Sequence, residues 1–96
     1  MIIKRTKYFC KWYDKLHLNI QNKIDSDIDK VSKGNFANCK SVGEGVHEIK
    51  IDYQKGYRVY FTNKNGEIII LLLGGNKSTQ QEDIENAKKL KKVLEV

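Results

Sequence analysis

The stretch VHEIKIDYQKGYRVYFTNKNGEIIILLL, residues 46–73, decides the fold, because it contains three strand-like segments joined by two short connectors. The expected strands are Val46–Ile51, Tyr57–Thr62 and Glu67–Leu73, and the connectors are Tyr53–Gly56 and Asn63–Gly66. Connectors this short favour antiparallel neighbours. The run from Ile68 to Leu73 is apolar throughout, so it is expected to be a buried, central strand. The stretch therefore predicts an antiparallel sheet.

Two amphipathic helices are expected before this sheet. Apolar side chains recur at the spacing of one helix face in two stripes, which are Phe9, Trp12, Tyr13 and Leu16, then Ile20, Ile24, Ile28 and Val31. Thr6 and Asn19 are the expected N-caps, and Gly34 is the expected stop signal. About two residues separate the helices, so they are expected to form an antiparallel hairpin.

The remaining segments add a strand, an irregular region and a helix. Ile2 and Ile3 begin a short strand, whereas residues 35–45 are expected to be irregular. Thr79 and Glu82 have the spacing of a capping box, so the last helix is expected to begin at Thr79. Its sheet-facing positions would be Ile84, Ala87, Leu90 and Leu94, and its lysines at 88, 89, 91 and 92 would form a solvated face.

The expected order of elements is β-α-α-β-β-β-α in a single domain over residues 1–96. Its fold class is α+β, with an N-terminal helical hairpin and a C-terminal helix packed on a small antiparallel sheet. A chain of 96 residues is long enough to bury one modest core.

Composition limits the class of partner. The chain has 18 Lys and Arg against 12 Asp and Glu, a formal net charge of +6. This charge favours a polyanion such as nucleic acid, although solubility alone also rewards it.

Cys10 and Cys39 lie far apart, so no disulfide framework, metal or cofactor is expected. The charged N-terminus is too short for a signal peptide and no apolar run approaches the roughly 20 residues of a membrane span, so we expect a cytoplasmic protein without a membrane partner.

Strand alternation predicts a polar face on the sheet. Side chains along a strand point alternately to opposite faces. If the strands pair with their apolar faces aligned, one face gathers Glu48, Lys50, Arg58 and Tyr60, and the other gathers Ile49, Ile51, Val59 and Phe61. The polar face is either an ordinary wet face with a cross-strand charge pair, worth about 0.2–1 kcal/mol, or a site for chemistry.

The segment Gly74–Thr79 is similar to a phosphate-binding loop but departs from that motif. The motif needs Gly directly before the Lys, where this chain has Asn76, and a second Gly five positions earlier, where it has Leu71. The free amides of a helix start and the Lys77 ammonium can still hold one phosphate. The alternative is a glycine-rich turn followed by a helix cap.

Four strings in order resemble the "addiction module killer protein" branch of the RelE/ParE superfamily, often called HigB-like. They are Gly34-Asn35, GEGVHEIK at residues 43–50, GYRVYF at residues 56–61 and LLGGNKSTQQEDI at residues 72–84. Trp12 and the spacing of the helical hairpin fit the same branch, so the resemblance covers nearly the whole chain.

The resemblance implies a toxin of a type II toxin–antitoxin system with the fold expected above. It implies a cognate antitoxin, a helix-turn-helix protein encoded nearby, through which alone the toxin would reach operator DNA. For the RelE-like members it implies an endoribonuclease (mRNA interferase) that cleaves mRNA on the ribosome without metal and inhibits translation. The 2′-hydroxyl of the RNA attacks the neighbouring phosphate, and side chains move protons and stabilise charge.

The residues of the polar face suit this reaction. Glu48 is the candidate general base, and Arg58 is the candidate for stabilising charge on the phosphate. Lys50 and Lys77 would add positive charge or protonate the leaving group. The candidate RNA-binding residues are Lys55, Tyr57, Tyr60, Asn76 and Thr79. Many members of the superfamily use His or Tyr near the C-terminus, and this chain has neither after Tyr60, so the general acid is left open.

Two other functions share the expected fold or charge. A ParE-like inhibitor of DNA gyrase has the same fold but needs no RNA-cleaving residues. A non-catalytic RNA-binding or ribosome-binding module needs the basic surface but not Glu48. The grouping of Glu48, Lys50 and Arg58 favours the nuclease over both alternatives.

Overall fold

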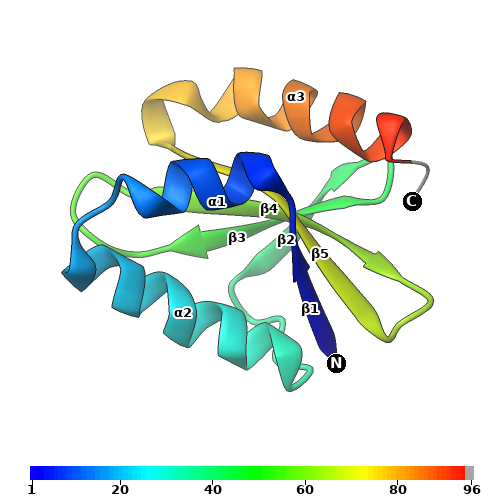
Figure 1. Cartoon of the computed structure of the whole chain (residues 1–96), viewed down its shortest axis with the longest axis horizontal. Coiled ribbons are helices and arrows are strands. Elements are labelled where there is room, and N and C mark those ends of the chain that lie inside the picture. Colours follow the sequence, from blue (N-terminus) through cyan, green and yellow to red (C-terminus); the bar gives the residue numbers. More distant parts are fainter. Residues whose placement is uncertain (95–96) are drawn as a thin grey trace.

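The computed structural model describes residues 1–94 and places a five-stranded sheet between helices (Figure 1). In chain order the elements are β1 (Ile2–Arg5), α1 (Lys7–Asp14), α2 (Leu18–Ser32), β2 (Cys39–Gly43), β3 (Val46–Ile51), β4 (Tyr57–Lys64), β5 (Ile68–Asn76), the short 3₁₀ helix η1 (Lys77–Thr79) and α3 (Gln80–Val93). The strands lie side by side in the order β1-β5-β4-β3-β2. The α+β class predicted from the sequence is confirmed.

The sheet differs from the predicted one at both edges. β1 pairs with β5 in parallel, with Ile2 opposite Ile68, so the sheet is mixed rather than antiparallel. The segment expected to be irregular contains β2, which pairs antiparallel with β3. β2 is an edge strand of mostly exposed residues with a register shift between Ser41 and Gly43. Such a strand needs no regular apolar alternation, which is why its pattern was missed.

The helical hairpin forms as predicted, with one change of cap. The Thr6 side chain accepts a hydrogen bond from the Phe9 amide at 3.1 Å, so the predicted cap of α1 is confirmed. The predicted Asn19 cap is wrong, because α2 begins one residue before it, at Leu18, with His17 as the N-cap residue. Gly34 follows the end of α2 at a φ of 85°, a conformation that favours glycine.

The two predicted apolar stripes pack on one face of the sheet. The main core is formed by α1 and α2 against the strands and includes Phe9, Ile20, Ile24, Ile28, Val31, Ile49, Ile51, Val59 and Phe61. Burying one such side chain stabilises a fold by about 1.5–3 kcal/mol. Trp12, Tyr13 and Leu16 are partly buried against this core.

A smaller core lies on the opposite face under α3. Tyr60, Leu72 and Ala87 are buried there, with Ile84 and Leu90 half-buried beside them. Leu94 was expected to face the sheet, but it is 42% exposed, so that prediction is wrong. It follows the last residue of α3 rather than lying within the helix.

Gly74 and Gly75 are residues of β5 rather than part of the connector expected after Leu73. Gly74 lies against Trp12 of α1, and Gly75 lies against Asp83 and Thr79 at the start of α3. A Cβ on either glycine would overlap these side chains. The two glycines therefore let helices approach the same part of β5 from both faces of the sheet.

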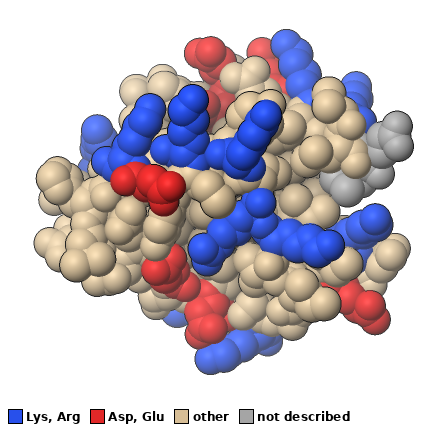
Figure 2. Space-filling model, viewed as in Figure 1, with Lys and Arg blue, Asp and Glu red and all other residues tan. Residues whose placement is uncertain are grey.

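Charged side chains are spread unevenly over the surface. On the face seen in Figure 2, Lys and Arg side chains outnumber Asp and Glu and gather toward α1 and α3. Part of the C-terminal lysine run is paired, because Lys88 and Lys92 lie 3.7 and 3.4 Å from the Glu44 carboxylate in the β2–β3 turn. Within residues 1–94, no helix is both long and apolar enough to cross a membrane.

Candidate functional site

The side chains predicted to share one face of β3 and β4 do share it. β3 and β4 pair so that Glu48 lies opposite Tyr60 and Lys50 lies opposite Arg58. These four side chains share the face that α3 covers, whereas Ile49 and Val59 belong to the core under α1 and α2. The separation of polar and apolar faces is therefore confirmed.

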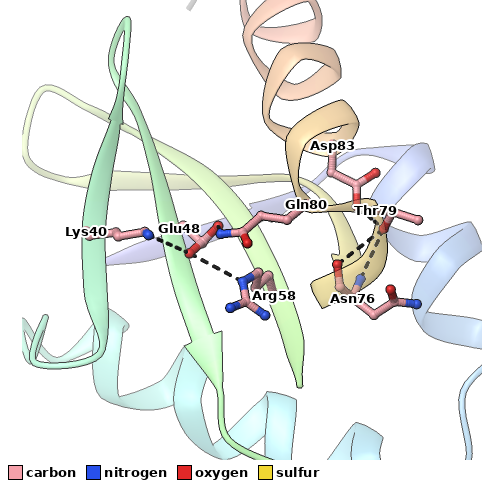
Figure 3. Close-up of polar contacts among 7 residues, drawn as sticks. All are labelled: Lys40, Glu48, Arg58, Asn76, Thr79, Gln80 and Asp83. Carbon is pink, nitrogen blue, oxygen red and sulfur yellow. Dashed lines mark hydrogen bonds and ion pairs between the residues drawn. The ribbon is translucent and has the colours of Figure 1, made fainter. Parts of the chain in front are cut away.

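This face is not the open, wet surface that alternation suggested. Glu48 is 2% exposed, Arg58 is 8% exposed and Tyr60 is fully buried, whereas Lys50 is exposed. The start of α3 lies beside Glu48, with the Gln80 side chain reaching toward it (Figure 3), and Tyr60 packs in the core that includes Ala87 of α3. Arg58 is therefore not part of an ordinary wet sheet face.

Glu48 is held by side chains from three other elements. Gln80, the first residue of α3, donates a hydrogen bond from Nε2 to Glu48 Oε2 at 2.9 Å. Arg58 Nε lies 3.6 Å and Lys40 Nζ lies 3.7 Å from Glu48 Oε1. A buried carboxylate needs such partners, because an unpaired charge away from water is costly. Lys40 and Gln80 were missed, although Lys40 lies directly opposite Glu48 in the missed strand β2.

Arg58 keeps unused hydrogen-bonding capacity. Its Nε and Nη1 atoms are buried without a hydrogen-bond partner in the described part of the chain, since the contact with Glu48 is an ion pair at 3.6 Å. Buried polar atoms are normally hydrogen-bonded, and a guanidinium fork matches two oxygens of one phosphate. Arg58 is therefore a buried cation whose hydrogen-bonding capacity the described part of the chain does not fully satisfy.

Tyr60 places a neutral hydroxyl near Glu48 and Arg58. The Tyr60 hydroxyl is also buried, with no hydrogen-bond partner among residues 1–94. Burial, and next the negative charge of Glu48, raise the pKa of Tyr60 well above its usual range. The hydroxyl therefore keeps its proton at neutral pH and can donate a hydrogen bond.

The turn before α3 is capped differently from the prediction. The Asn76 side chain accepts from the Ser78 amide at 2.9 Å, and the Thr79 side chain accepts from the Asn76 amide at 3.3 Å. The capping box is therefore Asn76 and Thr79, and the predicted box of Thr79 with Glu82 is wrong, because η1 precedes α3. Thr79 also donates to Asp83 at 2.5 Å. Burial raises the pKa of Asp83 more than this hydrogen bond lowers it.

The other predicted residues lie around the rim or away from it. Lys50, Lys55 and Lys77 are exposed, and the Lys77 amide donates to the Gly56 carbonyl at 3.1 Å, which brings the η1 segment beside the β3–β4 connection. Tyr57 packs against the core under α1 and α2, so the structure does not bring its side chain to the face of Arg58.

Comparisons with known proteins place the chain in a family. Residues 11–93 match the family described as phage derived protein Gp49-like (DUF891). A protein of Haemophilus influenzae, itself uncharacterised, is 47% identical over 93 residues, which cover 96% of this chain and 94% of that protein.

Solved structures show the fold. The E. coli toxin RelE, as a mutant in the free state, has a TM-score of 0.72 at 13% identity and covers 91% of this chain and 92% of its own. The intact E. coli RelBE toxin–antitoxin complex gives a TM-score of 0.67 at 15% identity, covering 78% of this chain and 94% of the matched chain. The arrangement of sheet and helices is thus that of RelE, and the chain belongs to the phage-derived protein Gp49-like family.

Proposed function

We propose that this chain is the toxin of a type II toxin–antitoxin system, HigB-like, and that it cleaves mRNA on the ribosome without a metal ion. The observation that carries the proposal is the buried Arg58 guanidinium, which is held beside Glu48 and has two nitrogens without a hydrogen-bond partner. The RelE fold and the net charge of +6 agree with an RNA substrate.

The reaction needs groups that neutralise a phosphate. The 2′-hydroxyl of the RNA loses its proton to a solvent base as its oxygen attacks the adjacent phosphorus. The bond to the 5′-oxygen breaks, that oxygen takes up a proton, and the products are a 2′,3′-cyclic phosphate and a 5′-hydroxyl. The positive charge of Arg58 stabilises the non-bridging oxygens, where negative charge builds up. Tyr60 adds a neutral donor from inside the site. Removing one such electrostatic contact typically costs on the order of 100–1,000-fold in rate.

Glu48 acts mainly by positioning Arg58. Its carboxylate is 2% exposed and its oxygens already contact Gln80, Arg58 and Lys40. To accept a proton from a 2′-hydroxyl, it would have to give up one of these contacts. The geometry thus favours a positioning role over the role of general base predicted from the sequence. The exposed Lys50 and Lys77 supply positive charge at the rim and can protonate the leaving oxygen.

The same proposal names the partners. The E. coli RelBE complex is a toxin–antitoxin complex, and an RelE mutant is also known with an antitoxin RelBc peptide. By analogy, we propose a cognate antitoxin that neutralises this chain and carries any contact with operator DNA. The targets of this chain itself would be the ribosome and mRNA in the cytoplasm.

The deciding experiment is induced expression with and without the neighbouring gene, followed by mapping of mRNA ends. Expression without the neighbouring gene should give growth arrest and new mRNA ends. The purified protein should cut mRNA on ribosomes even in the presence of a chelator. A substrate with 2′-deoxyribose at the cut site should resist cleavage. Arrest without new ends would overturn the nuclease function. Loss of supercoiling by gyrase would then support the ParE-like alternative, and ribosome binding without cleavage would support a non-catalytic module.

A further inference from the structure

A cavity of about 340 Å³ lies on the sheet beside the segment that joins α2 to β2. Residues of this segment, β2, β3 and β4 line it. Small-molecule sites have volumes of roughly 300–1,000 Å³, so this cavity has room for one ring system rather than for a long chain.

The cavity lies on the face of the sheet opposite the candidate site. In the register of the sheet, Ser41 of β2, His47 of β3 and Phe61 of β4 form one row, and all three line the cavity. Side chains in such a row point to the same face. Phe61 belongs to the core under α1 and α2, whereas Glu48 and Arg58 lie on the other face of the sheet. A ligand in the cavity would therefore be separate from any chemistry at Arg58.

Aromatic rings form much of the cavity wall. The rings of His47 and Phe61 are stacked, with their centroids 5.2 Å apart and their planes inclined by 26°. Phe36, in the segment before β2, also lines the cavity and is 40% exposed. Phenyl and imidazole rings are surfaces on which nucleobases stack. The wall is therefore suited to a planar ring.

An amide beside these rings lacks a partner. Asn63 lines the cavity, and its Oδ1 atom is buried without a hydrogen-bond partner among residues 1–94. Buried polar atoms are normally paired, so this part of the wall lacks a donor. The amide has to rotate toward the cavity to meet a ligand, and this terminal torsion has a broad range. An apolar side chain would leave Oδ1 unpaired, whereas a ring with an amino group supplies the donor.

The charges at the cavity indicate a neutral ring. Burial, and next the charge of Asp27, raise the pKa of the Cys39 thiol in the wall to about 11, so the thiol is uncharged at neutral pH. Lys40 also lines the cavity, but its ammonium lies 3.7 Å from Glu48 on the other face of the sheet.

We propose that this cavity binds a nucleobase that carries an amino group, with adenine as the best match. Adenine presents an amino group beside a ring nitrogen, and a side-chain amide can pair with both groups at once. The base can belong to a free nucleotide or to single-stranded RNA. Binding of the base does not depend on the proposed function, and only the RNA source rests on it.

The test is a titration of the whole chain with adenosine at constant pH, followed by NMR of the histidine ring protons. Adenosine carries no phosphate, so the basic surface does not attract it. The chain has two histidines, and His17 at the start of α2 is the internal control. The His47 signals should shift saturably, because a stacked base changes their magnetic environment, and the His17 signals should stay in place. Purine riboside, which is adenosine without the amino group, should bind about tenfold more weakly.

Three variants test the groups that are named. Phe36→Ala should weaken adenosine binding by about tenfold, because it removes a stacking ring. Tyr8→Ala is the matched control, since Tyr8 is an aromatic residue of α1 that is 51% exposed, and it should bind normally. Asn63→Leu keeps the approximate size of the side chain without its amide, so it should bind adenosine and purine riboside alike.

Three results would overturn the assignment. They are equal shifts at His17 and His47 or no saturable shift, equal adenosine binding by Phe36→Ala and the native chain, and a dimer in sedimentation equilibrium that Phe36→Ala dissociates, since a second copy would then fill the cavity.

Two further ligands identify the source of the base. A ribohexamer with one adenine among uridines should bind at least tenfold more tightly than adenosine monophosphate if RNA is the source, as read from the His47 signals. Equal affinity of the two would assign the cavity to a free nucleotide. Adenosine binding by a chain that cleaves no RNA would refute only the proposed function, and cleavage without adenosine binding would refute only the base site.

Discussion

Glu48→Gln removes the charge that neutralises Arg58 while keeping the shape of the side chain. Glu48 is 2% exposed and the Arg58 side chain is 10% exposed, so solvent screens their ion pair little. Breaking a buried pair by removing one partner costs about 3–5 kcal/mol, because the remaining charge is left uncompensated. Lys40 also loses its partner, but its side chain is 64% exposed, so that loss adds little.

The expected loss is large for a chain of this size. For a domain of 60–100 residues, each 1 kcal/mol of stability corresponds to about 4–8 °C in Tm, so Glu48→Gln should lower Tm by roughly 12 °C or more. Thermal unfolding followed by circular dichroism measures this shift. A change of only a few degrees would contradict the buried pair.

A double-mutant cycle tests the cause directly. Arg58→Met fills the site with an apolar chain, and the double variant with Glu48→Gln has neither charge. The double variant should be less destabilised than the sum of the single variants by about 1–3 kcal/mol in urea unfolding. The exposed Lys50→Met combined with Glu48→Gln is the control cycle and should be additive. Additivity within about 0.5 kcal/mol in the Arg58 cycle would refute the pairing.

Four further changes have definite expected outcomes. Arg58→Ala should abolish toxicity and new mRNA ends, with circular dichroism used to check that the buried site still folds; full toxicity of a folded variant would contradict the role of Arg58. Gly75→Ala should lower the unfolding free energy, because the added methyl overlaps Asp83 and Thr79. Thr6→Ala should cost about 0.5–2 kcal/mol in urea unfolding, since it removes the cap of α1. Burial raises the pKa of Asp83 above its ordinary value of 3.8, so the folded chain binds the carboxyl proton more tightly than the unfolded chain does. The stability that this group contributes is therefore present below pH 3.8 and is lost as the pH rises through the raised pKa. Asp83→Asn should flatten this fall in urea titrations at several pH values; an unchanged profile would contradict the burial of the carboxyl.

Elements with strong local patterns were predictable from the sequence. The stripes that include Ile24 and Phe9 are buried as their helical spacing indicated, and β3 has the predicted bounds Val46–Ile51. In each case the local period and the tertiary burial agree, because one face of the element meets the core and the other meets solvent or a second layer.

The edges of the sheet were not predictable in this way. β2 is exposed along most of its length and is held by pairing with β3 rather than by apolar side chains. The parallel position of β1 beside β5 depends on contacts between residues more than 60 positions apart, such as Ile2 and Ile68. The glycines of β5 were assigned to the connector after the strand, because the packing of Trp12 and Asp83 on them is a tertiary effect. Local periodicity carries none of these constraints.

The site shows the same division between local and tertiary information. Alternation placed Glu48 and Arg58 on one face, but it equated polar with exposed. Their burial comes from α3, whose first residue, Gln80, reaches back to Glu48. This burial changes the chemical interpretation of Arg58. An exposed arginine would lose side-chain freedom on meeting a phosphate, whereas one fixed against Glu48 has been ordered by folding. A preorganised cation stabilises charge in a transition state without that cost. Neutralising Glu48 should therefore impair the site even where Arg58 itself is intact.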